Sequence, residues 1–118
     1  MVLGATHWQV TDGTRTAANE VTRRFGGTWN TYVGHGLPPA RGEAYTVDFW
    51  DPGGRGDPLD EHRGDAMVGW ILGQHQVKPV RILIWWSYIW TPGVGWKPYS
   101  GFQGNHGPGR DAHIHVGY

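Results

Sequence analysis

The stretch AHIHVGY, residues 112–118, alternates apolar side chains with histidines. Successive side chains of a β-strand point to opposite faces, so Ile114 and Val116 share one face while His113 and His115 share the other. The apolar face can pack on a core, and the two imidazoles then lie about 6–7 Å apart along the strand, facing a cleft. The pattern predicts a strand with one buried face, and its histidine face is either a functional site or simply a polar strand face.

Three other stretches predict strands. TWNTYV, residues 28–33, is short and rich in β-prone residues, and AYTVDFW, residues 44–50, alternates so that Asp48 shares a face with Thr46. VRILIWW, residues 80–86, is nearly continuous in apolar residues, which is typical of a central strand buried on both faces. The following SYIWT either extends that strand or follows a bend.

Two segments carry helical signals. Residues 14–24 are good helix formers that follow a capping Thr11 or Asp12 and stop at Gly26. Residues 59–74 carry a helical spacing at Met67, Trp70, Ile71 and Gln74. The Gly-rich tract 92–109 is predicted to be a long loop, and long loops in compact domains are usually functional. We therefore expect a single α+β domain, residues 1–118, with a small antiparallel or mixed central sheet, two helices and long Gly-rich loops.

The composition excludes several classes of function. Ten basic and ten acidic residues cancel, so neither a nucleic-acid partner nor an anionic membrane surface is expected. There is no cysteine, so a metal would be held by histidine and carboxylate. The N-terminus has no signal-peptide pattern, and no apolar run approaches the roughly 20 residues that cross a bilayer. A soluble chain without membrane insertion is expected.

Tryptophan and glycine are in excess, with eight and 20 residues respectively. Indole rings that exceed the needs of a small core can line a groove, where their flat faces stack on sugar or peptide. They can equally fill a Gly-rich core that is short of aliphatic side chains. If they border a groove, the substrate-binding candidates are Trp85, Trp86, Trp90 and Trp96.

The histidines and Asp48 form a chemically adequate set for zinc. A hydrolytic zinc site takes three protein ligands, commonly histidine and carboxylate, and leaves a fourth position for water. His115 or His113 can supply one ligand and Asp48 a second. His35 lies in the loop that leads into the Asp48 strand.

The ordered motifs resemble a known family. A Gly34-His35 loop, the DFW of residues 48–50, GRGDPL at residues 54–59 and a terminal HIHV at residues 113–116 are similar to the zinc peptidases of the D-Ala-D-Ala carboxypeptidase/lysostaphin-like superfamily. The closest likeness is to the peptidase domain of actinobacteriophage (mycobacteriophage) lysin A endolysins, over residues 28–118. The RGD inside GRGDPL is interpreted as a turn, not as an adhesion motif.

The resemblance implies roles for individual residues. It makes Asp48 and His115 zinc ligands, with His113 beside the metal as an acid/base group. Asp111 is then the orienting partner of His113 or the base itself, and His106 either stabilises the oxyanion or caps a loop. The superfamily usually has its first histidine seven residues before the aspartate, where this chain has Arg41, which cannot bind zinc.

His35, thirteen residues before Asp48, is therefore the predicted first ligand. The expected function is a monomeric, zinc-dependent (Zn2+) peptidase that is made in the host cytoplasm and cuts an amide bond of the peptidoglycan stem peptide during lysis. An open zinc site at the exposed end of the sheet would serve it. Two alternatives remain: a non-catalytic, aromatic-rich cell-wall-binding module, and a zinc-stabilised structural domain of a virion, with His106 as a fourth ligand.

Overall fold

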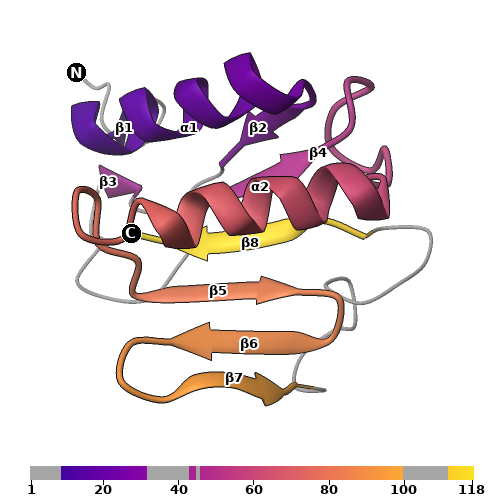
Figure 1. Ribbon diagram of the computed structural model, residues 1–118. Coiled ribbons are helices and arrows are strands. Elements are labelled where there is room, and N and C mark those ends of the chain that lie inside the picture. Colours follow the sequence, from indigo (N-terminus) through magenta and orange to yellow (C-terminus); the bar gives the residue numbers. More distant parts are fainter. Residues whose placement is uncertain (1–8, 32–42, 45, 100–111) are drawn as a thin grey trace.

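A computed structural model describes residues 9–31, 43–44, 46–99 and 112–118 (Figure 1). The helices and strands in these ranges are β1 (Gln9–Val10), α1 (Asp12–Phe25), β2 (Thr28–Asn30), β3 (Glu43–Ala44), β4 (Thr46–Trp50), α2 (Glu61–Gly73), β5 (Ile82–Trp85), β6 (Tyr88–Thr91), β7 (Gly95–Pro98) and β8 (Ile114–Gly117). No helix of these ranges is long and apolar enough to cross a membrane.

The main sheet has six strands in the order β2-β4-β8-β5-β6-β7, and every neighbouring pair is antiparallel. The short strands β1 and β3 form a separate parallel pair. β8 follows β7 in the sequence but lies between β4 and β5 (Figure 1). The predicted α+β class, with a small antiparallel sheet and two helices, is confirmed.

Capping residues set the helix starts. The Thr11 side chain accepts a hydrogen bond from the Thr14 backbone N–H, so α1 begins at Asp12, two residues before the predicted start. Gly26 ends α1 at a φ of 81°, which glycine adopts without strain. Asp60 caps α2 by accepting from the Arg63 N–H, which excludes Leu59 from that helix.

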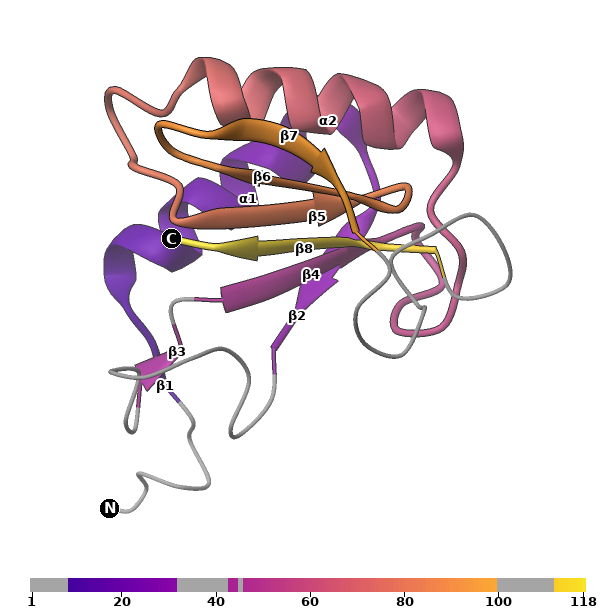
Figure 2. The ribbon, with the colours of Figure 1, turned by 90° about the horizontal axis from the view of Figure 1, so that it is seen from below.

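Both helices cover the same face of the sheet (Figure 2). The core between them contains apolar residues of the helices and of alternate strand positions: Ala18, Val21, Met67, Val68 and Ile71 with Val47, Phe49, Leu83, Trp85, Ile114 and Val116. This alternation is the one expected from the sequence for β4 and β8. β5 is buried on both faces, as predicted, because Leu83 and Ile84 are both nearly inaccessible.

β5 and β6 form a hairpin. Trp86 and Ser87 occupy the two-residue turn with φ values of 55° and 67°, the backbone conformation of a tight hairpin turn. The SYIWT stretch therefore follows a bend. The prediction of one long loop over residues 92–109 is wrong in its first part, because Gly95–Pro98 pairs with β6 as strand β7.

Candidate functional site

Four neighbouring strands align one residue each across the face that is opposite the helices. Asn30 of β2 is paired with Asp48 of β4, Asp48 with His115 of β8, and His115 with Ile84 of β5. Side chains at directly paired positions lie on the same face. The register of the sheet therefore brings the aspartate to the terminal histidines.

Asp48, His113 and His115 form what we call the Asp48 cluster. Asp48 Oδ1 lies 3.3 Å from His115 Nδ1 and 3.7 Å from His113 Nε2. The side chains of Asp48 and His113 are each 7% exposed and that of His115 is 18% exposed. The cluster is buried on interior strands. The sequence had suggested a site at an exposed end of the sheet, and the cluster does not lie there. Electrostatic interactions are stronger at such a buried position than in water.

Trp50 holds the imidazole of His113 in place. The two rings stack at a centroid distance of 4.3 Å and an angle of 20°, and Trp50 is almost fully buried. The Trp50 indole N–H donates to Asn30 Oδ1 at 2.7 Å, which fixes the indole in turn. Sequence reasoning missed both residues as parts of the site. Trp50 could have been found, because it shares the strand face of Asp48.

The segment 51–59, which contains GRGDPL, is joined by a hydrogen bond to the residue that precedes His113. Its backbone turns are hydrogen-bonded, with Gly54 N–H donating to Asp51 O and Asp57 N–H donating to Gly54 O. Leu59 N–H then donates to Ala112 O at 2.8 Å, directly beside His113. The RGD is therefore part of a turn, as predicted, and the segment fixes the entry of the chain into β8.

The Asp48–His115 pair has the spacing of two zinc ligands. Zinc bonds of about 2.0–2.2 Å to nitrogen and oxygen in a tetrahedral site separate neighbouring donor atoms by about 3.3–3.6 Å. The 3.3 Å between Asp48 Oδ1 and His115 Nδ1 matches this separation, while the 3.7 Å to His113 Nε2 is slightly longer. No group of three or more His, Asp or Glu in the described ranges is arranged to hold a metal ion. A zinc site here needs another ligand from the rest of the chain.

Three of the predicted site residues lie outside the described residues. They are His35, His106 and Asp111. The structure therefore brings together Asp48, His113 and His115 of the predicted set.

The four indoles predicted to border a substrate groove do not lie with the Asp48 cluster. Trp90 is paired with Leu83 and with Trp96, and Trp85 is two residues from Leu83, so these three indoles lie on the helix-covered face. Trp86 is in the hairpin turn. Trp85 packs in the core, where its indole N–H donates to Asp65 Oδ1 at 2.9 Å. The expectation that these indoles border the zinc site does not fit the sheet register. Ile84 is the β5 residue paired with His115, so its neighbour Trp85 lies on the opposite face.

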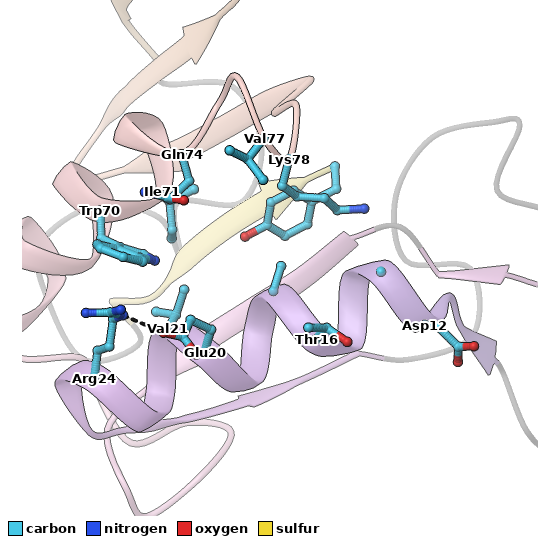
Figure 3. A pocket seen from close by; sticks show the side chains of 13 residues that line it. Asp12, Thr16, Glu20, Val21, Arg24, Trp70, Ile71, Gln74, Val77 and Lys78 are labelled. Atoms are coloured by element: carbon cyan, nitrogen blue, oxygen red, sulfur yellow. Dashed lines mark hydrogen bonds and ion pairs between the residues drawn. The ribbon is translucent and has the colours of Figure 1, made fainter.

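A pocket of about 640 Å³ lies between α1, α2 and Tyr118 (Figure 3). Arg24 covers the Trp70 ring at 3.8 Å and pairs with Glu20, and the hydrogen bonds from Arg23 and then Arg24 lower the pKa of Glu20. Burial lowers the pKa of Lys78, whose ammonium lies 5.2 Å from the centre of the Tyr118 ring. The pocket is separated from the Asp48 cluster by the sheet.

Residues 6–113 match the model of a protein family described as VldE, C-terminal domain. The chain belongs to this family. The match includes β1 to β7 and His113 of the Asp48 cluster. No curated protein and no solved structure matches the chain. The description of the VldE C-terminal domain family names no reaction, so the chemistry of the site rests on its side chains.

Proposed function

We propose that the chain is a zinc-dependent peptidase that hydrolyses an amide bond of the peptidoglycan stem peptide, acting on the cell wall after synthesis in a host cytoplasm. The observation that carries the proposal is the convergence of His113 and His115 on one buried oxygen of Asp48. The motif resemblance supports the substrate class. Both lines of support are independent of the indoles on the opposite face.

Asp48 and His115 hold the metal in this proposal, and His35 supplies the third ligand. Zinc held there would act as a Lewis acid that lowers the pKa of a water toward about 7 and polarises the scissile carbonyl. In this proposal His113, whose ring stacks on Trp50, takes a proton from the nucleophile and returns it to the departing amine. Asp111 is the alternative base or the partner that orients His113, and His106 is the candidate for stabilising the oxyanion.

The test combines metal content with turnover. The purified chain is loaded with zinc, dialysed and incubated with purified peptidoglycan while newly released amino groups are measured. We expect one zinc per chain, release of amino groups, loss of that release with a chelator, and recovery when zinc is added back. Retained zinc without release of amino groups would contradict the proposal.

The alternatives give different results in the same experiment. Binding to peptidoglycan without zinc and without new amino groups would favour a cell-wall-binding module. A metal held by four protein ligands, with no position left for water, would favour a structural virion domain. The exposed aromatic rings described next are the observation that keeps the binding module in consideration.

A further inference from the structure

A second pocket of about 540 Å³ lies between α2 and the strands β5–β7, on the helix-covered face. Aromatic rings of the strands and of the β5–β6 turn form one side: Trp85, Trp86, Tyr88 and Trp96. Residues of α2 form the other side: Asp65, Val68, Gly69 and Leu72. The sheet separates this aromatic pocket from the Asp48 cluster. A ligand in this pocket therefore does not contact the Asp48 cluster.

Two rings of the aromatic pocket are held by contacts and two are accessible. Trp85 and Trp86 are in contact at a centroid distance of 5.0 Å and an angle of 45°, and the Trp85 N–H is bonded to Asp65. Tyr88 and Trp96 are 49% and 45% exposed, although both are large and apolar. Large rings that stay accessible beside a pocket are typical of a binding site.

The charge of the pocket favours a cation. Asp65 is the one charged side chain that lines it, and no Lys, Arg or His within the described ranges forms an ion pair with Asp65. The faces of indole and phenol rings carry negative potential and attract ammonium groups that lie within about 6 Å. The hydrogen-bonding groups of the described lining are the Asp65 carboxylate, the Tyr88 hydroxyl and the indole N–H groups of Trp86 and Trp96. A negative carboxylate beside several ring faces favours a cation over a neutral sugar.

We propose that the aromatic pocket binds an organic ammonium ion, held between the rings of Trp86, Tyr88 and Trp96 and neutralised by Asp65. Two sources share this chemistry: a quaternary ammonium group, and the primary ammonium of an alkylamine such as a lysine-type side chain. The Asp65 carboxylate can accept further hydrogen bonds from such an ion, since a carboxylate accepts several and the Trp85 N–H uses one of them.

Calorimetric titration of the full chain with three small probes tests the proposal. Choline represents the quaternary source, n-butylammonium the primary source, and 3,3-dimethyl-1-butanol is the uncharged isostere of choline. We expect at least one cation to bind about tenfold or more tightly than the neutral isostere. The stronger of the two cations identifies the source. Binding of neither cation, or binding of the neutral isostere as tightly as both cations, would overturn the proposal, as would binding of muropeptide sugars in their place.

Three variants locate the binding. Trp96→Ala removes an exposed ring and should weaken cation binding about 2- to 30-fold. Asp65→Asn removes the charge but keeps an acceptor for the Trp85 N–H, so a loss of affinity reports charge and not misfolding. Gly69→Leu places a side chain where a Cβ meets no atom within 4 Å, which fills the pocket while improving helix propensity.

Val94→Ala is the matched control, because Val94 is exposed on the same hairpin and does not line the pocket. It should leave the affinity unchanged. Thermal unfolding of each variant verifies that the fold is retained. Unchanged cation affinity in folded Trp96→Ala and Asp65→Asn would refute the site, even if the wild-type chain binds the probes. This test reads cation affinity and not peptidase activity. Failure of this proposal is therefore distinct from failure of the proposed function.

Discussion

The two histidines of the Asp48 cluster have different surroundings, and this difference predicts different roles. His115 Nδ1 is the nearer nitrogen to Asp48, whereas His113 is stacked on Trp50. We expect His115→Ala to lose most of its bound zinc. His113→Ala should retain zinc and lose turnover by about 10²–10⁴-fold, the usual contribution of an acid/base group.

Zinc titration and amine release on the same preparations check this division. The titration must cover a wide concentration range, because losing a group beside a metal ligand can itself weaken metal affinity about 10–100-fold. Equal loss of zinc in both variants would assign both histidines to the metal. Trp50→Phe is a useful companion, since it keeps a ring against His113 but removes the hydrogen bond to Asn30.

His35 is the predicted third ligand, and its replacement is a separate test. His35→Ala should abolish release of amino groups and greatly weaken zinc binding. His62→Ala is the control, because His62 is exposed near the start of α2 and should change neither property. His75→Ala should also keep zinc but lower the free energy of unfolding by about 0.5–1.5 kcal/mol, since His75 Nδ1 accepts the Val80 N–H. Survival of zinc and activity without His35 would transfer the ligand role to His106.

At the level of single residues, the sequence predicted faces but not partners. Alternation correctly placed His113 with His115, away from Ile114 and Val116. The opposition of Asp48 to His115 depends on the register of strands far apart in the sequence, which alternation does not contain. The burial of Trp85 was equally hard to predict. It depends on a position of α2 that has no side chain, and no local pattern in the strand reveals that position.

That helix position is Gly64, and α2 depends on it. A Cβ built at Gly64 would lie 2.2 Å from Trp85 Cζ2, so Gly64→Ala forces the indole to move. We expect a cost of about 1–3 kcal/mol from overpacking, only partly offset by a gain of up to about 1 kcal/mol in helix propensity. The free energy of unfolding should therefore fall, as measured by urea denaturation.

Gly69→Ala on the same helix is the matched control. Its Cβ would meet no atom within 4 Å, so the substitution should raise the free energy of unfolding by about 0.5–1 kcal/mol. Equal effects of the two substitutions would mean that Trp85 adapts without strain. The contrast separates the general preference of helices for alanine from the specific need for space at Gly64.

At the level of elements, the existence of both helices and of β2, β4, β5 and β8 was predictable, because each has its own periodicity or capping signal. β7 was not. Its sequence GWKP has a glycine and a proline and little β-preference, so its extended form depends on hydrogen bonds donated and accepted by β6. The observed start of each helix differs by two residues from the predicted start, because Thr11 and Asp60 act as caps outside the helices.

For the whole molecule, bound zinc should stabilise the fold. Asp48 and His115 lie on adjacent interior strands, so a ligand that joins them binds the folded state and not the unfolded chain. At a free zinc concentration 100-fold above Kd, linkage predicts about 2.7 kcal/mol of stabilisation. Tm should rise by roughly 10 °C in calorimetry. His115→Ala should show no such rise, and a zinc-independent Tm in the wild-type chain would contradict a metal site at this position.

The place of β8 between β4 and β5 has a consequence for how the chain reaches its native state. During synthesis, β4, α2 and β5–β7 are all complete before β8 is made, so two strands wait with unpaired backbone edges facing the gap. Such edges invite pairing with other chains, and closing them requires contacts between distant segments, which form slowly. Until β8 arrives, the nascent protein is at its most aggregation-prone, and it cannot yet assemble the Asp48 cluster. A chain interrupted before residue 112 would therefore lack both a closed sheet and the histidines, which keeps any hydrolytic activity confined to molecules that have finished folding.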